Sequence, residues 1–208
     1  MAFSLIISVF SLFSVTNGNM LTSIQQASQG LKYYGRDYVI GNEGLYFGSS
    51  LFGAVKILIT LLSANELYNY YYMIGRFLGL YYWMASALLI IVTLYIMFIE
   101  KEFWKRICLL VFCIILLPLV SADYKLLYLY IPFFLFLNSK QKDKYDTIYT
   151  VLFSLLFIPK NYLNFEFPSL ILHSEANFGI ILNPVLMLVI CYFIFKSRWD
   201  ILIRNLLG

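Results

Sequence analysis

Charged residues are scarce in this chain, and their scarcity excludes an ordinary soluble domain. Lys, Arg, Asp and Glu make up 12% of its 208 residues, against about 25% in soluble globular proteins. Hydrophobic residues make up 62%, and the mean hydropathy is +0.80. The apolar runs are continuous, and several approach the roughly 20 residues that a helix needs to cross a bilayer. The composition therefore predicts an all-α fold, a polytopic transmembrane helix bundle.

Histidine and cysteine are also scarce, which argues against a zinc site or a disulfide framework. The three cysteines lie within apolar runs and form no CxxC pair: Cys108, Cys113 and Cys191. The single histidine, His173, is accompanied by Glu166 and Glu175, but one histidine and two separated acids are a weak metal pattern. The chain has no Walker-type loop, GxSxG elbow or HExxH motif. We predict neither a metal nor a cofactor.

Positive charge is absent from the first 31 residues and is concentrated in three short links. Residues 100–106, 138–146 and 196–208 contain three Lys or Arg each, and the positive-inside rule places such links in the cytoplasm. The net charge of +4 is thus explained by topology, and we predict no nucleic-acid binding. We expect an integral protein of a bacterial inner membrane with both termini in the cytoplasm.

The apolar runs predict about six spans plus one re-entrant or interfacial helix. The expected spans are residues 2–15, 76–99, 107–120, 124–138, 147–158 and 179–196. Residues 49–63 are short and carry a central Lys56, which favours a re-entrant or interfacial position. We expect a single transmembrane domain over residues 1–208 with outer loops at 16–75 and 160–178. Within the first loop, Met20–Leu31 has the pattern of a short amphipathic helix, and residues from Gly35 onward have the pattern of a loop.

The turn at 121–125 holds the first candidate site residues, Asp123, Tyr124 and Lys125. Charged residues between two apolar runs are costly in a membrane and are a functional-site hypothesis by default. Lys125 or Tyr124 is a candidate for binding a phosphate-bearing ligand at the outer face, since a lysine is a suitable partner for phosphate. The alternative is an interfacial turn whose charged groups meet water or each other.

Acidic and basic residues of the first outer loop supply the other candidates. Asp37 and Glu43 are candidate catalytic carboxylates, because a carboxylate near an acceptor hydroxyl can act as a general base. They are equally interpretable as solvated loop acids, and Arg36 can pair with Asp37. Lys56 and Arg76 flank a tyrosine cluster, either contacting a lipid phosphate or extending toward the headgroups.

Two stretches resemble a known family. The segment 118–132, Pro-Leu-Val-Ser-Ala-Asp-Tyr-Lys-Leu-Leu-Tyr-Leu-Tyr-Ile-Pro, resembles the late Ser-x-Asp-Tyr-(Arg/Lys)-Leu…Pro segment of GT-C-type glycosyltransferases, and most closely glycosyltransferase family 87 (DUF2029). Residues 41–45, Gly-Asn-Glu-Gly-Leu, with Ser-Leu-Phe-Gly at 50–53, are similar to a stretch that precedes a re-entrant segment in such proteins. Family members are usually about twice as long, so the resemblance is to their C-terminal part.

The resemblance implies transfer of a sugar from a polyprenyl-phosphate-linked donor to a glycan or lipid acceptor on the outer membrane face. It implies that Lys125 lies near the donor phosphate, that membrane lipids surround the chain, and that a partner subunit is needed if the chain is incomplete. A polysaccharide polymerase has a similar topology and the same kind of donor. A non-catalytic transport or assembly component is the alternative from another functional class.

Overall fold

The computed structural model describes residues 19–41, 45, 48–63, 66–140, 143–160, 164–166 and 175–207. The described residues are mostly helical, as predicted, and the chain divides into two compact units, Met1–Gly41 and Asn42–Gly208. The span expected at 2–15 lies outside the described residues.

The first unit contains the amphipathic helix predicted from Met20. This helix, α2 (Met20–Tyr34), begins at Asn19, whose side chain accepts a hydrogen bond from the Thr22 N–H at 3.3 Å, a common N-cap arrangement. The loop predicted from Gly35 onward was wrong, because a π-helix, η1 (Gly35–Ile40), follows directly. Gly35 keeps right-handed helical backbone angles and its N–H still bonds to carbonyls of α2, so the helical path does not end there.

Helices of very different length make up most of the second unit. Two short helices, α3 (Leu51–Leu62) and α7 (Asp146–Phe157), have 12 residues each. Two long ones, α4 (Leu67–Phe98) and α8 (Gly179–Leu207), have 32 and 29 residues. Both long helices extend beyond the predicted spans, since the tyrosine-rich residues before 76 belong to α4 and the tail after 196 belongs to α8.

The remaining elements of this unit differ from the prediction in detail. Helix α5 (Phe103–Leu116) begins earlier than the expected span. The span expected at 124–138 consists of a 3-10 helix, η3 (Asp123–Leu129), followed by α6 (Tyr130–Leu137). The loop expected at 160–178 contains a short antiparallel hairpin, β1 (Asn164–Glu166) with β2 (Glu175–Asn177).

Two of the described helices are long and apolar enough to cross a membrane, α4 and the Gly179–Ile201 part of α8. In α4, only 6% of the most apolar window is buried inside the structure, against 44% in α8. Helix α4 therefore presents most of its apolar surface outward, whereas α8 packs among its neighbours.

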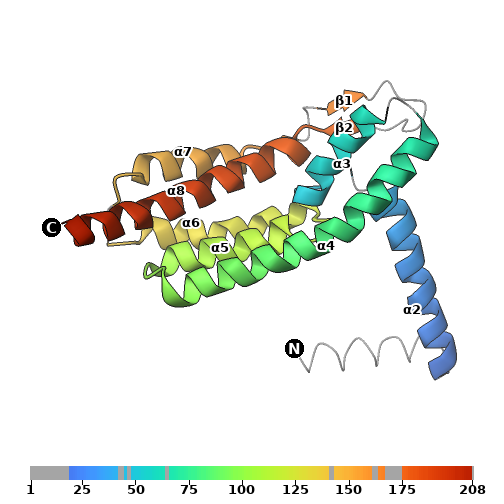
Figure 1. Cartoon of the computed structure of the whole chain (residues 1–208), viewed down its shortest axis with the longest axis horizontal. Coiled ribbons are helices and arrows are strands. Elements are labelled where there is room, and N and C mark those ends of the chain that lie inside the picture. Colours follow the sequence, from blue (N-terminus) through green and yellow to red (C-terminus); the bar gives the residue numbers. More distant parts are fainter. Residues whose placement is uncertain are drawn as a thin grey trace. The chain divides into compact units, whose positions relative to one another are not determined.

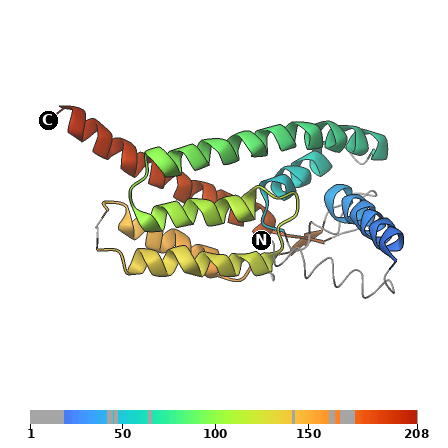
Figure 2. The same ribbon diagram turned by 90° about the horizontal axis from the view of Figure 1, so that it is seen from below.

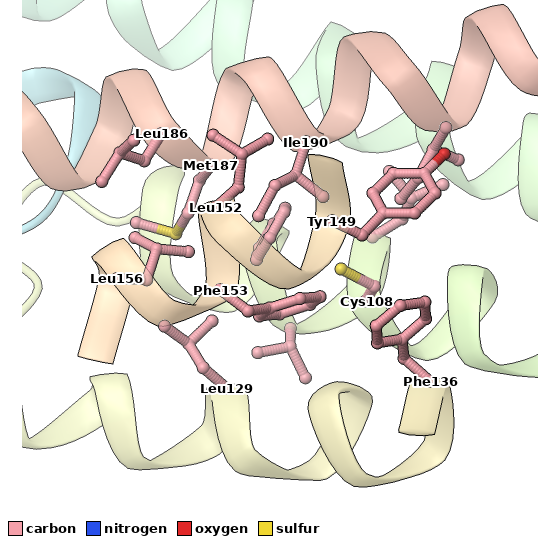
Figure 3. Close-up of a cluster of buried hydrophobic side chains, with 14 of the residues drawn as sticks. Cys108, Leu129, Phe136, Tyr149, Leu152, Phe153, Leu156, Leu186, Met187 and Ile190 are labelled. Carbon is pink, nitrogen blue, oxygen red and sulfur yellow. The ribbon is translucent and has the colours of Figure 1, made fainter. Parts of the chain in front are cut away.

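Helices α5, α6, α7 and α8 share a continuous hydrophobic core (Figure 3). In the close-up, side chains of α7 such as Phe153 lie between residues of α8 and of the η3–α6 segment. Phe153, Cys108 and Met187 are fully buried at 0% exposure. This core aligns the helices so that their ends gather at two opposite ends of the unit.

The three basic links lie at the same end of the second unit. The α4–α5 link, the α6–α7 link and the C-terminal part of α8 gather there, whereas η3, the hairpin and the start of α8 lie at the opposite end (Figures 1 and 2). We call these the basic end and the hairpin end.

A buried ion cluster joins the helices at the basic end. The Lys105 ammonium is 1% exposed and contacts Glu102 at 2.8 Å and Asp143 at 2.7 Å. It also donates to the Ser197 hydroxyl at 3.0 Å, and that hydroxyl donates to Asp143. Trp104 donates its indole N–H to Glu102 at 3.0 Å. This cluster links α5, the α6–α7 link and α8.

Candidate functional site

A pocket of about 200 Å³ lies at the hairpin end. Its walls come from η3, the start of α6, the end of α7, strand β2 and the first turns of α8. Most of the lining is apolar, and four polar side chains interrupt it: Asp123, Lys160, Asn177 and Asn183. Apolar walls with a few convergent polar groups are typical of ligand sites.

A short stretch before α3 holds one wall of this pocket in place. Gly48 and Ala122 form an isolated antiparallel bridge, and the Ser49 N–H donates to the Ser121 carbonyl at 2.8 Å. The Ser49 hydroxyl donates to Asp123 Oδ1 at 3.0 Å. Residues more than 70 positions apart are thereby joined beside the pocket.

Ser50 adds a second attachment one residue later. Its hydroxyl oxygen accepts a hydrogen bond from the Gly53 N–H at 3.0 Å and so caps α3. The same hydroxyl donates to the Leu119 carbonyl at 3.0 Å. Both hydrogen-bonding capacities of Ser50 are used, which makes it part of the frame of the site rather than of its chemistry.

Asp123 is the one acidic residue that lines the pocket among the described residues. Burial raises the pKa of this carboxyl above its ordinary value, because the charged form is poorly solvated. The hydrogen bond from Ser49 and the charge of Lys160 act in the opposite direction without offsetting the effect of burial. A carboxylate of this kind is a stronger proton acceptor than a solvated one.

Lys160 closes the end of α7 next to the pocket and is 6% exposed. Its ammonium donates to three carbonyl groups near the end of α7, of Leu155 at 2.9 Å, Leu156 at 3.4 Å and Ile158 at 2.9 Å. Cations are favoured at a helix C-terminus, where carbonyl groups are left unpaired. Burial lowers the pKa of Lys160, and the nearby charge of Asp123 partly opposes that shift.

Two asparagines complete the polar lining at the start of α8. Asn177 accepts a hydrogen bond from the Gly179 N–H at 2.7 Å, which fixes the turn into the helix. Asn183, 3% exposed, donates from Nδ2 to the Ser49 hydroxyl at 3.1 Å. Its Oδ1 is buried and accepts no hydrogen bond from the described residues. The Ser121 hydroxyl is likewise buried and has no hydrogen-bond partner among them. Buried polar groups without a hydrogen-bond partner are rare in folded proteins.

Of the three residues predicted in the 121–125 turn, one lines the pocket. Asp123 does so, whereas Tyr124 is 67% exposed. Lys125 is half-buried, and its backbone N–H donates to the Ala122 carbonyl at 3.0 Å. The expected tight turn is the first turn of a 3-10 helix, which turns successive side chains in different directions.

Lys56 and Arg76 lie elsewhere in the second unit. Lys56 is in α3 and is 1% exposed, so its side chain is surrounded by protein. Arg76 lines an open groove of about 560 Å³ between α3 and α4, where its guanidinium donates to the Tyr72 hydroxyl at 2.9 Å. Neither residue lines the pocket at the hairpin end.

Of the two predicted catalytic acids, the structure describes Asp37. Asp37 belongs to η1 in the first unit, and its carboxylate pairs with Arg36 at 2.7 Å on an exposed surface. That hydrogen bond with Arg36 lowers the pKa of Asp37, which weakens it as a base. Glu43 lies outside the described residues.

Sequence reasoning missed Lys160 and Asn183. Lys160 follows Pro159 at the end of an apolar run, and its position resembled an ordinary loop cation. Asn183 precedes Pro184 inside the last apolar run, and an Asn-Pro pair there was a usable signal, since a polar residue within a span needs a partner. Proline also lacks the N–H that would otherwise bond within the helix.

The part of the chain that the structure describes contains no group of three His, Cys, Asp or Glu side chains suited to a metal ion. No family model, curated protein or solved structure matches the chain. The pocket geometry is therefore the basis for a functional proposal.

Proposed function

We propose that this protein is a membrane glycosyltransferase of GT-C type. It moves a sugar from a polyprenyl-phosphate-linked donor to a glycan or lipid acceptor at the outer face of a bacterial inner membrane. The observation that carries the proposal is the half-buried carboxylate of Asp123, hydrogen-bonded to Ser49, in a pocket at the end opposite the basic links. The resemblance of residues 118–132 to family 87 supports it from the sequence.

The proposed reaction assigns the general-base role to Asp123. The acceptor hydroxyl oxygen forms a bond to the anomeric carbon of the sugar. The bond from that carbon to the phosphate oxygen breaks, and the phosphate leaves with the electron pair. Asp123 takes the proton of the acceptor hydroxyl, a role suited to its raised pKa. Lys125 and Tyr124, next in the chain, are the proposed contacts for the departing phosphate.

The proposed topology has about six spans and places both termini in the cytoplasm. The shared location of the three basic links supports it (Figure 1). In a cysteine-free background, Tyr124→Cys and Lys140→Cys provide exposed positions at the two ends. We expect an impermeant thiol reagent to label Tyr124→Cys from outside and Lys140→Cys only after permeabilisation. Labelling of both from one side would contradict the topology.

Transfer of radiolabelled sugar from a short-chain polyprenyl phosphate donor in proteoliposomes tests the activity. We expect Asp123→Asn to reduce the turnover by at least about 100-fold, as is typical for loss of a general base. Asp37→Asn and Glu43→Gln are matched controls that test the acids first predicted from the sequence. If only those two variants lose sugar-transfer activity, the general base lies in the first outer loop and is not Asp123.

If the intact protein binds donor or acceptor but forms no product, the glycosyltransferase proposal fails. Such a result would favour the non-catalytic transport or assembly component. Products that lengthen by whole repeat units, rather than by one sugar, would favour a polysaccharide polymerase.

A further inference from the structure

We propose that the pocket at the hairpin end binds an uncharged, hydroxyl-rich group, a single saccharide ring, through Asp123 and Asn183, and that it excludes phosphate. The inference rests on the proposed function in treating this ring as the acceptor. It separates the pocket from the donor phosphate, which must then bind outside it.

The direction of the hydrogen bonds around Ser49 fixes the orientation of the Asn183 amide. A serine hydroxyl has one proton, and Ser49 donates it to Asp123 Oδ1 at 3.0 Å. Ser49 must then accept from its other neighbour, and the donor of Asn183 is the amide nitrogen, 3.1 Å away. The amide oxygen of Asn183 is thereby directed away from Ser49, buried and without a donor among the described residues.

The pocket consequently offers hydrogen-bond acceptors, and a ligand that binds there must supply the donors. An ionised carboxylate accepts several hydrogen bonds, and Ser49 supplies one of them to Asp123. The Asn183 oxygen is a second acceptor, fixed in place by the bond from its own nitrogen. Hydroxyl groups on adjacent carbons of a sugar ring can donate to both. A phosphate dianion would bring mostly acceptors and a charge of the same sign as Asp123.

Lys160 is a cation beside the pocket and could be expected to bind phosphate. It does not reverse the preference of the pocket for hydrogen-bond donors. An ammonium group has three N–H donors, and Lys160 directs its donors to the carbonyl groups at the end of α7 at distances of 2.9, 3.4 and 2.9 Å. Its positive charge still acts on Asp123. The opposite charges of Asp123 and Lys160 offset each other, so the pocket offers no net charge to an ionic ligand, and an uncharged ligand is preferred.

The size of the pocket limits the ligand to about one ring. Its volume of about 200 Å³ is below the roughly 300–1,000 Å³ of pockets that enclose drug-sized ligands. One wall is formed by Tyr130 and Phe157, whose rings stack with centroids 4.4 Å apart. An apolar wall of this kind suits the C–H face of a sugar, whereas the polyprenyl chain has no room in the same space.

The test is saturation-transfer NMR and titration on the purified full chain in phosphatidylcholine nanodiscs. The probes are methyl glycosides of glucose, mannose and galactose, with glucosamine and inorganic phosphate as charged probes. We expect at least one methyl glycoside to bind, its dissociation constant to be unchanged by phosphate, and glucosamine to bind at least about tenfold more weakly. Competition by phosphate, or binding of none of the glycosides, would overturn the inference.

Asn183→Leu removes the acceptor at nearly constant volume and should weaken glycoside binding by at least about tenfold. Asn138→Leu is the matched control, because Asn138 is exposed at the basic end. If Asn183→Leu does not fold, Asp123→Asn provides the second variant, with the same expected loss from removal of a charge-assisted acceptor. Unchanged binding in whichever variant folds would contradict the proposal, as would glycoside binding that disappears on removal of divalent cations.

The two proposals fail in different ways. If the intact protein binds a glycoside through Asn183 but transfers no sugar, the proposed function fails and the saccharide pocket stands. If sugar is transferred while Asn183→Leu leaves the KM for the acceptor unchanged, the function stands and the saccharide pocket fails.

Discussion

The Lys105 cluster at the basic end of the second unit and the pocket at its hairpin end differ in how their buried polar groups are bonded. At the basic end, Lys105 meets two carboxylates and a hydroxyl, so its charge is fully compensated. At the hairpin end, the Asn183 oxygen and the Ser121 hydroxyl are buried without a partner among the described residues. A compensated cluster joins helices, whereas an uncompensated one remains available to a ligand. The Tyr149 hydroxyl and Arg198 Nε at the basic end are also buried without a partner among the described residues, so the contrast is between the Lys105 cluster and the pocket lining rather than between the two ends as a whole.

Removing Lys105 should have the largest effect on stability. Lys105→Met leaves the partly buried carboxylates of Asp143 and Glu102 without their buried cation, and breaking a buried ion pair costs about 3–5 kcal/mol. We expect a strong fall in the melting temperature in detergent, measured by tryptophan fluorescence. Lys140→Met, an exposed lysine at the same end, should change it little. Equal melting temperatures would mean that the cluster does not join the helices.

Lowering the pH should reduce the stability that the Asp143 carboxylate contributes at the basic end. Burial alone would raise the pKa of Asp143, but hydrogen bonds from Lys105 and Ser197 outweigh burial and lower it. A lowered carboxyl pKa stabilises the fold above the ordinary value of about 3.9, and that stability is lost as the pH falls through the folded pKa. Hydrogen bonds to charged groups contribute about 1.5–3 kcal/mol.

The comparison to make is between the wild type and Asp143→Asn. The wild type should melt at the higher temperature at pH 7, and the gap should narrow as the pH falls below about 4. Asp146→Asn is the control, an acid of the same link that forms no ion pair among the described residues. A gap that does not change with pH would contradict the role of the Asp143 charge.

Substituting Ser50, at the hairpin end, should cause an intermediate loss of stability. Ser50→Ala removes the cap of α3 and the bond to the Leu119 carbonyl, and loss of an N-cap typically costs about 1 kcal/mol. Ser154→Ala should cost less, because the Ser154 hydroxyl is exposed and bonds within its own helix. If the two variants melt alike, Ser50 does not hold α3 to the pocket.

Asp123→Asn should have the smallest effect on stability. Burial raises the pKa of Asp123, so the ionised form opposes folding above that pKa and the opposition is lost as the pH falls. An uncharged amide removes this cost, and we expect a melting temperature at pH 7 equal to or slightly above that of the wild type. A fall as large as that of Asp143→Asn would make the hairpin end a second structural cluster.

Several parts of the fold could be predicted from the sequence because they depend on local pattern. The helical class, α2 and the gathering of the basic links follow from hydrophobic periodicity and from the placement of Lys and Arg. The extents of α4 and α8 could not be predicted, because the tyrosine-rich and amphipathic segments continue the helices without a break. The hairpin was missed since its strands have three residues each, too few for a visible alternation.

The site was only partly predictable for a similar reason. Asp123 stood out because a charge between apolar runs is costly. Its neighbours in space, Ser49, Lys160 and Asn183, come from segments separated by up to 134 positions and carry no local motif. Asp37 was predicted because a carboxylate in the first outer loop could act as a general base, and the structure pairs it with Arg36 on an exposed surface.

The length of α4 sets a scale for the whole second unit in a bilayer. Its 32 residues extend about 48 Å at 1.5 Å per residue, whereas the hydrocarbon core is about 30 Å thick. If its C-terminal end lies at the cytoplasmic boundary, about 20 residues reach the other boundary, close to Tyr81, Tyr82 and Trp83, where an aromatic belt is favoured. The first turns of α4 then extend beyond the hydrocarbon core on the outer side. Helix α3 packs on Phe77 and Tyr81 through Phe52, so it would lie at the membrane–water interface.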